Sequence, residues 1–163
     1  KIRELASNKM HKIKDCLIFY PRQENHNLRE LLKNAHVFLL FNDYSILGTK
    51  IFDYIASKRK ILLCFSNDPD AEALKRKHYN LKEFPHLSKS LQADMISSTN
   101  SGIVVRDSQH LKVVLKDLWN EFQEKGYIEC NSHSIEQYSR RRQTEKLAVV
   151  IKEVVEEYKK GKP

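Results

Sequence analysis

The chain has 163 residues, of which 40% are apolar and 31% are charged, and its formal net charge at pH 7 is +8. This length fits one domain around one hydrophobic core, and a composition with only four Gly and four Pro excludes disordered and collagen-like chains. The positive charge favours polyanionic partners, but aromatic residues are not interleaved with the basic ones as in single-strand binders, so we expect no nucleic-acid partner.

Cysteine and histidine usage indicates neither a disulfide framework nor a metal site. Cys16, Cys64 and Cys130 are odd in number and widely spaced, and the seven histidines include no pair at metal-ligand spacing on one helix. A reducing, cytoplasmic compartment is therefore expected. No apolar run approaches the ~20 residues that span a bilayer, and peripheral contact at the inner face of the membrane stays an open alternative.

The first third of the chain predicts helix, strand, helix and strand in turn. Apolar residues at helical spacing predict a helix over residues 1–12, and CLIFY predicts a buried strand over 16–20. Asn27 and Glu30 resemble a capping box at the start of a short helix with an apolar stripe. The run VFLLF predicts the second strand, over 37–41.

A strand, helix, strand unit follows from the two apolar runs around GTKIFDYIAS. The expected strands cover 37–41 and 61–65, and the helix between them covers 48–57. Such a unit implies a parallel sheet. The loop over 42–47 then lies at the carboxyl end of the sheet, where ligands of open α/β sheets bind.

The start of the helix over 48–57 has the chemistry of an anion site. Gly48, Thr49 and Lys50 open it, and a cation there opposes the helix dipole by about 0.3–1 kcal/mol unless an anion binds too. Free backbone amides, a hydroxyl and an ammonium together suit a phosphate, and Asp53 one turn later can accept hydrogen bonds from sugar hydroxyls. A solvated surface helix with the same residues is the alternative.

The middle of the chain is less regular. Asp68 and Pro69 predict a helix to about residue 77, and residues 79–101 give mixed signals, with LQADMIS as a short helix or an edge strand. GIVV predicts a strand over 102–105.

Two helices are expected at the end of the chain. Asp107 or Ser108 caps a helix that Gly126 ends, with its apolar face made by Leu111, Val114, Leu115, Leu118, Trp119 and Phe122. The final helix covers 135–159 and carries a stripe of Leu147, Ile151, Val154 and Tyr158. Its basic start, residues 140–142, is interpreted as a solvated helix face rather than as a contact with a membrane or nucleic acid.

Alternating strands and helices predict one domain over 1–163 with an α/β, Rossmann-like fold, a doubly wound parallel sheet flanked by helices. Such domains normally begin with a strand, whereas this chain opens at Lys1 on a predicted helix. We therefore expect a fragment of a larger protein.

Residues 28–65, LRELLKNAHVFLLFNDYSILGTKIFDYIASKRKILLCF, resemble the donor-binding, carboxyl-terminal half of group 1 glycosyltransferases with the GT-B fold. The segment NSGIVVRD is similar to a later segment of that family. The resemblance implies a hexosyltransferase that transfers a sugar from a nucleotide-diphosphate sugar to an acceptor, in surface polysaccharide or glycoconjugate synthesis. It also implies no cofactor, no metal in the sugar-binding cleft, retention of anomeric configuration, and a missing amino-terminal acceptor domain without which the fragment is inactive.

The same resemblance assigns donor-binding residues, whereas catalytic residues stay unassigned. Asp53 matches the acid that hydrogen-bonds the ribose, although the family usually has Glu there, and Ser45 stands where the first acid of the paired motif is expected. Gly48 matches a loop glycine, and Thr49 and Lys50 lie where the diphosphate approaches the helix. Gly-Lys-Pro after the helix is replaced by Lys-Arg-Lys over 58–60.

Two other functions remain open. A non-catalytic nucleotide-binding module can share this fold, since fold does not determine function. A receiver-like regulatory module is more distant: Asp43 follows a buried strand as a phosphorylated aspartate would, but CLIFYPRQ lacks the acidic pair that such a module needs.

Overall fold

The computed structural model describes residues 16–41, 48–64, 73, 88 and 90–161. Contacts divide the chain into two compact units, Lys1–Asn34 and Ala35–Pro163. The described part of the first unit contains helix α2 (Asn25–Lys33).

Two predictions in the first unit are wrong. Residues 17–20 form neither strand nor helix, and Cys16 is exposed rather than buried in a strand. A strand needs a neighbouring strand to satisfy its backbone hydrogen bonds, and the described part of this unit contains no strand with which residues 17–20 could pair. The capping box is also wrong, because α2 begins at Asn25 after Glu24, which places Asn27 inside the helix.

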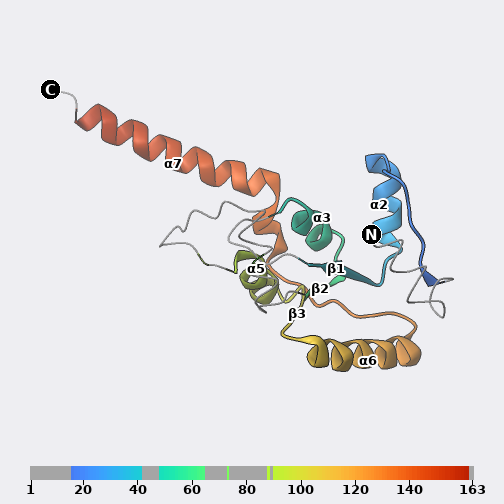
Figure 1. Cartoon of the computed structure of the whole chain (residues 1–163). Helices are drawn as coiled ribbons and strands as arrows, with labels where there is room; N and C mark the ends of the chain where they lie inside the picture. The colour runs from blue at the N-terminus through green and yellow to red at the C-terminus, as the bar shows by residue number, and fades with distance from the viewer. Residues whose placement is uncertain (1–15, 42–47, 65–72, 74–87, 89, 162–163) are drawn as a thin grey trace. The chain divides into compact units, whose positions relative to one another are not determined.

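The second unit confirms the α/β class, with a parallel three-stranded sheet flanked by helices (Figure 1). This architecture is compatible with a Rossmann-like fold. Its elements in chain order are β1 (Val37–Leu40), α3 (Lys50–Ala56), β2 (Lys60–Cys64), α5 (Leu91–Thr99), β3 (Gly102–Val105), α6 (Ser108–Lys125), the 3-10 helix η2 (Ile135–Tyr138) and α7 (Arg140–Lys160).

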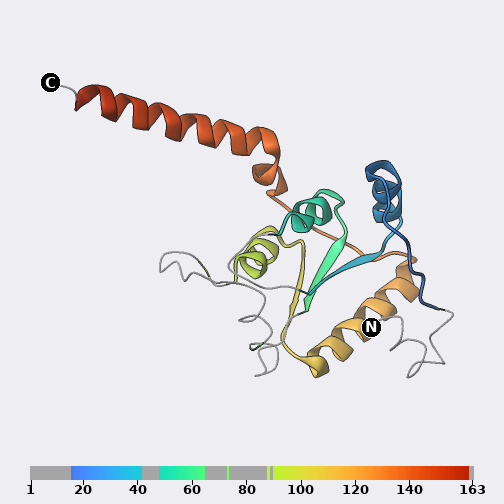
Figure 2. The same cartoon turned by 45° about the horizontal axis from the view of Figure 1, so that its top comes forward.

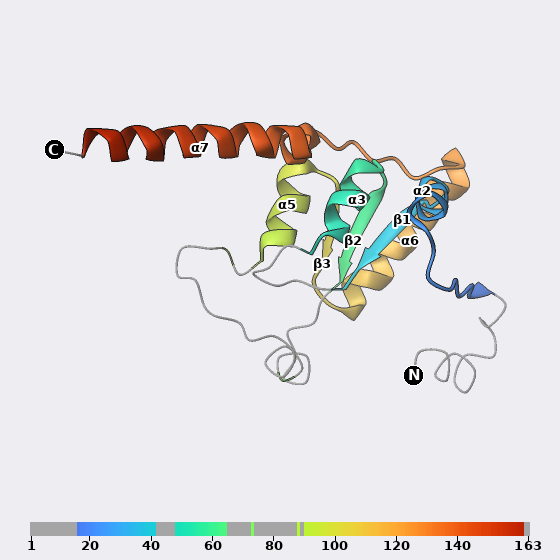
Figure 3. The ribbon, with the colours of Figure 1, turned by 90° about the horizontal axis from the view of Figure 1, so that it is seen from above.

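The strands lie in the order β1, β2, β3 and all run in the same direction (Figure 2). Val37 is the register partner of Lys60, and Ile61 is the partner of Gly102. Helices α3 and α5 cover one face of the sheet and α6 covers the other (Figures 1 and 3). The unit therefore has three layers around a central strand.

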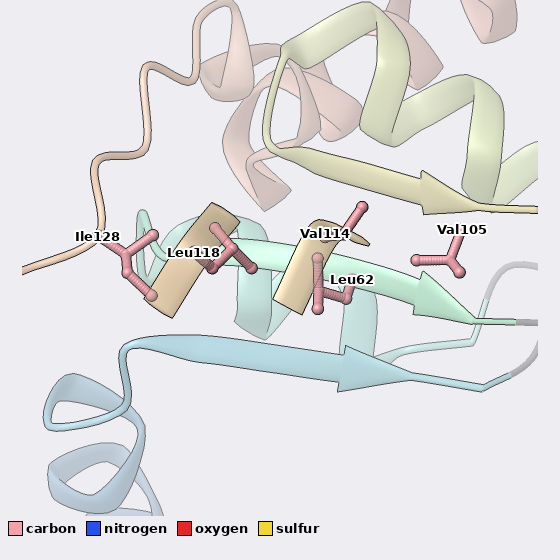
Figure 4. Close-up of a cluster of buried hydrophobic side chains, with 5 residues drawn as sticks. All are labelled: Leu62, Val105, Val114, Leu118 and Ile128. Atoms are coloured by element: carbon pink, nitrogen blue, oxygen red, sulfur yellow. The ribbon is translucent and has the colours of Figure 1, made fainter. Parts of the chain in front are cut away.

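The core is centred on β2. Ile61, Leu62 and Leu63 in succession are fully buried, as expected for a strand with helices on both faces. Leu62 packs on the α6 side in a cluster completed by Val105, Val114, Leu118 and Ile128 (Figure 4). The sequence predicted the strands that carry Leu62 and Val105 because each strand is an uninterrupted apolar run.

Helix α6 begins and ends where the sequence predicts. The Asp107 carboxylate accepts a hydrogen bond of 2.7 Å from the His110 amide, and Gly126 ends the helix in the left-handed region at φ 75°. The predicted apolar face is only partly used: Val114 and Leu118 are buried, whereas Trp119 is 60% exposed.

Five further predictions have separate outcomes, and one of them, the helix over 1–12, falls in the first unit. LQADMIS is helical, in α5. The continuous helix predicted over 135–159 is wrong, because η2 ends at Tyr138 and Ser139 adopts an extended conformation and caps α7 by accepting a hydrogen bond from the Arg142 amide. The predicted loop over 42–47, with Asp43 and Ser45, lies outside the described residues, as do the helix over 1–12 and, except for residue 73, the helix over 68–77.

Candidate functional site

The start of α3 lies at the carboxyl end of the sheet. Because β1 and β2 are parallel, the helix that joins them must return from the end of β1 to the start of β2. Its first residue, Lys50, therefore lies near the level at which β1 ends at Leu40. This is the edge at which α/β proteins bind ligands.

Buried side chains fix the rotation of α3 about its axis. Ile51 and Ile55, four residues apart, are 0% and 3% exposed and lie on the side that faces the sheet. The ring of Tyr54 stacks on Phe38 of β1, with centroids 4.4 Å apart and planes 17° apart. These contacts leave the opposite side of the first turn in solvent.

The structure brings four of the five predicted site residues to that exposed side or to the residues just before it. Gly48, Thr49 and Lys50 follow one another at the start of α3, Asp53 lies in its first turn, and all four are exposed. Ser45 lies outside the described residues.

Backbone bonds at the start of α3 leave its polar side chains available. The amides of Ile51 and Phe52 donate to the carbonyls of Gly48 and Thr49 over 3.4 and 3.2 Å. Thr49 occupies the N-cap position, but its hydroxyl forms no capping hydrogen bond. Because the amides of Ile51 and Phe52 already have partners, an anion or water at this end of α3 would contact the Thr49 hydroxyl and the Lys50 ammonium rather than those two amides.

The Asp53 carboxylate acts on its neighbourhood as a negative charge. Burial raises the pKa of the Tyr54 hydroxyl, and the charge of Asp53 beside it raises that pKa further. The Ser57 hydroxyl donates to the backbone carbonyl of Asp53 over 2.8 Å rather than to its carboxylate. The carboxylate is thus an exposed acceptor.

Helix α6 also starts at this end of the sheet, and its first turn is capped by a side chain of this chain. β3 ends at Val105 and α6 starts at Ser108, with Asp107 as its cap. The hydrogen bond from the His110 amide lowers the pKa of Asp107, and the Arg106 amide donates to Nδ1 of His110 over 3.1 Å. The start of α6 already has a carboxylate, whereas that of α3 does not have a side-chain cap.

A cluster of charged side chains, which the sequence did not reveal, lies at the opposite end of the sheet. Oε1 of Glu121 accepts the Glu129 amide over 2.9 Å, and Lys60 and Lys125 lie 3.7 and 3.6 Å from its carboxylate oxygens. These contacts, the amide first, lower the pKa of Glu121. Lys60, Glu121 and Glu129 line a small polar hollow of about 170 Å³. Since each charge of the cluster has an opposite one beside it, we interpret the cluster as structural.

A larger hollow of about 390 Å³ lies on the α6 face of the sheet. Its lining is apolar apart from one histidine: His36, Val37, Leu39, Leu62, Leu115, Leu118, Trp119, Phe122 and Ile128. A diphosphate would find no cation in this lining, so the hollow does not suit a nucleotide.

In α5, the buried Oε1 of Gln92 lacks a hydrogen-bond partner among the described residues.

Within the described ranges, no three His, Cys, Asp or Glu side chains are grouped as metal ligands. In the same part of the chain, no helix is both long enough and apolar enough to cross a membrane.

Comparisons of the chain with protein-family models, with curated proteins and with solved structures find no match.

Proposed function

We propose that this chain is the donor-binding part of a GT-B glycosyltransferase and that the start of α3 holds the nucleotide diphosphate of an activated sugar. The observation that carries the proposal is the exposed Asp53 in the first turn of a crossover helix that starts at the carboxyl end of a parallel sheet. The resemblance of residues 28–65 to the group 1 family supports the same assignment.

Each residue has a role in this proposal. Asp53 accepts hydrogen bonds from the ribose hydroxyls, while Gly48, Thr49 and Lys50 contact the diphosphate and stabilise the negative charge that develops on the leaving nucleotide. The interaction of the Lys50 ammonium with the positive end of the helix dipole is unfavourable by about 0.3–1 kcal/mol on its own. A bound anion makes the net interaction at the helix start favourable. The sugar is transferred without a metal in this cleft, and the acceptor is held by an amino-terminal half as in the family.

The turn after α3 departs from the family in sequence but is compatible with it in backbone conformation. Lys58 adopts the left-handed region at φ 51°, where glycine is favoured over other residues, and its amide donates to the carbonyl of Ile55 over 3.1 Å. The family has a glycine at this position of the motif. The backbone therefore takes here the conformation that the family's glycine permits, although this chain has a lysine.

Nucleotide titration tests the proposal. Adding UDP, GDP or ADP to the chain is expected to shift the amide resonances around Thr49 and Asp53 for at least one of the three nucleotides. Asp53→Ala should abolish that response, because it removes the ribose acceptor. Two-dimensional amide spectra of the labelled chain provide the measurement.

A matched control is available on α6. Asp117 is also an exposed aspartate on a helix, so Asp117→Ala makes the same change of charge away from α3 and should leave the nucleotide response intact. If the three nucleotides perturb no amide near α3, or if both variants lose the response equally, the assignment of this site is wrong.

A further inference from the structure

Helix α7 has an apolar stripe that no part of the described core buries. None of its 21 residues is buried. Leu147, Ile151, Val154 and Tyr158 follow one another at spacings of four, three and four, so they form one stripe along the helix. Val150 and Val155 widen it on either side. The principal contacts of α7 with another element are those with η2, which directly precedes it in the chain. Figure 3 shows α7 extending away from the sheet.

Charged residues are distributed unevenly around this stripe. At about 100° per residue, Arg141, Lys152 and Lys159 follow one margin of the stripe, and Lys146 lies at the other margin with Glu157. The remaining acidic residues, Glu145, Glu153 and Glu156, lie on the far side. Four of the seven basic side chains thus flank the apolar stripe, and three of the four acidic ones point away from it, as do Arg142 and Lys160.

The net charge of α7 is also positive. The helix carries seven basic and four acidic side chains, a net charge of +3. Only some of this charge is compensated locally: Glu145 pairs with Arg141 at 3.1 Å and with Arg142 at 2.9 Å. Lys and Arg beside an apolar face can extend their charged ends to lipid headgroups while their methylene stems lie on the apolar surface.

We propose that α7 binds the surface of an anionic membrane, lying along the boundary between headgroups and acyl chains. The stripe of Leu147, Ile151 and Val154 enters the acyl region, and Lys152 and Lys159 contact the acidic headgroups. The inference concerns α7 alone and does not depend on the nucleotide proposal for α3.

The shape of the stripe favours a lipid surface over a second copy of the helix. The spacing of four, three and four also fits the seam of a coiled coil, but such a seam is narrow and is flanked by charges that pair across it. Here the residues flanking the seam are Ala148, Val150 and Val155, which widen the apolar arc to about 160° at 3.6 residues per turn. A wide apolar arc with a cationic margin is typical of helices that lie on membranes.

Cosedimentation of the full chain with vesicles tests this proposal. Binding is expected to vesicles of phosphatidylcholine with about one third phosphatidylglycerol, and to be at least tenfold weaker to vesicles of phosphatidylcholine alone. Added salt should weaken binding, because the headgroup contacts are screened. Equal binding to both vesicle types, or no binding to either, would refute the proposal.

A pair of variants separates the stripe from the rest of the helix. Ile151 and Val149 are 53% and 54% exposed, but Ile151 lies in the stripe and Val149 on the opposite side. Ile151→Glu should lower vesicle affinity at least tenfold, whereas Val149→Glu should change it less than threefold. Equal losses would contradict the assigned face, and circular dichroism of both variants checks that the helix remains formed.

Two additional measurements distinguish the remaining outcomes. Lys152→Gln with Lys159→Gln should lower affinity for the anionic vesicles and reduce its dependence on salt. Light scattering should find a monomer; a dimer that Ile151→Glu dissociates, together with absent vesicle binding, would assign the stripe to a second copy instead. Asp53→Ala should bind vesicles like the unmodified chain, so that failure of the nucleotide proposal is seen separately.

Discussion

Gly102→Ala is expected to lower the free energy of unfolding by about 3 kcal/mol, at the upper end of the cost of overpacking. A Cβ added at Gly102 would overlap the carbonyl oxygen of Ile61 and lie 2.8 Å from its carbonyl carbon. These are backbone atoms of the register partner on β2, so they cannot move aside without disturbing the pairing of β2 with β3. Urea unfolding followed by circular dichroism measures the loss.

Gly48→Ala is the matched control for this substitution. A Cβ at Gly48 would meet no atom of the described residues within 4 Å. The same added methyl group should therefore change the unfolding free energy by no more than about 0.5 kcal/mol. Equal stability of the two variants would contradict the close approach of β2 and β3 at Gly102.

Leu62→Ala is expected to lower the free energy of unfolding by about 2–5 kcal/mol, the range for removing a fully buried leucine side chain. Leu62 is 0% exposed and contacts the core between the sheet and α6, where Val114 and Leu118 approach it (Figure 4). The cost comprises the lost burial of the side chain and the cavity left beside α6. Urea unfolding again provides the measurement.

The control for Leu62 is its register partner on β1. Leu39 pairs with Leu62 across the sheet but is 48% exposed. Leu39→Ala removes the same atoms from a half-solvated position and should cost about 1 kcal/mol or less. If the two substitutions lower the free energy of unfolding by the same amount, Leu62 is not at the centre of the core.

The parts of the fold that the sequence predicted are those with local signals. β1, β2 and β3 are short apolar runs, and α6 has both a capping aspartate, Asp107, and a terminating glycine, Gly126. Each of these features acts within a few residues, so a single sequence is enough to recognise the strand or helix that it marks. The parallel pairing of β1 with β2 could also be predicted, because a helix lies between the two strands in the chain.

The failures arise where the outcome depends on distant or competing partners. The apolar run over 16–20 has strand propensity, yet propensity without a neighbouring strand does not make a ladder. The last helix is interrupted because Ser139 caps α7 and so ends the preceding η2 at Tyr138. A capping serine inside a helical pattern competes with continuation of the helix, and periodicity alone does not decide between them.

The candidate site shows the same division. At helical spacing Ile51 and Ile55 lie on one side of α3 and Asp53 on another, and the structure buries the two isoleucines and exposes the aspartate, because the rotation of a helix follows from its apolar side. The charged cluster around Glu121 was missed, since Lys60 comes from β2 and Glu129 follows the end of α6. Only the folded chain brings those residues together.

The most direct test of the nucleotide site is a calorimetric cycle that removes the ribose hydroxyls and the Asp53 carboxylate separately and together. For the diphosphates of uridine, guanosine and adenosine, each is compared with its 2′,3′-dideoxy analogue on the unmodified chain and on Asp53→Asn. A hydrogen bond to a charged group contributes about 1.5–3 kcal/mol, so at least one ribonucleotide should bind the unmodified chain about tenfold or more tightly than its analogue. Asp53→Asn should erase that difference; a variant that keeps it, or an unmodified chain that binds none of the three diphosphates, would contradict the account.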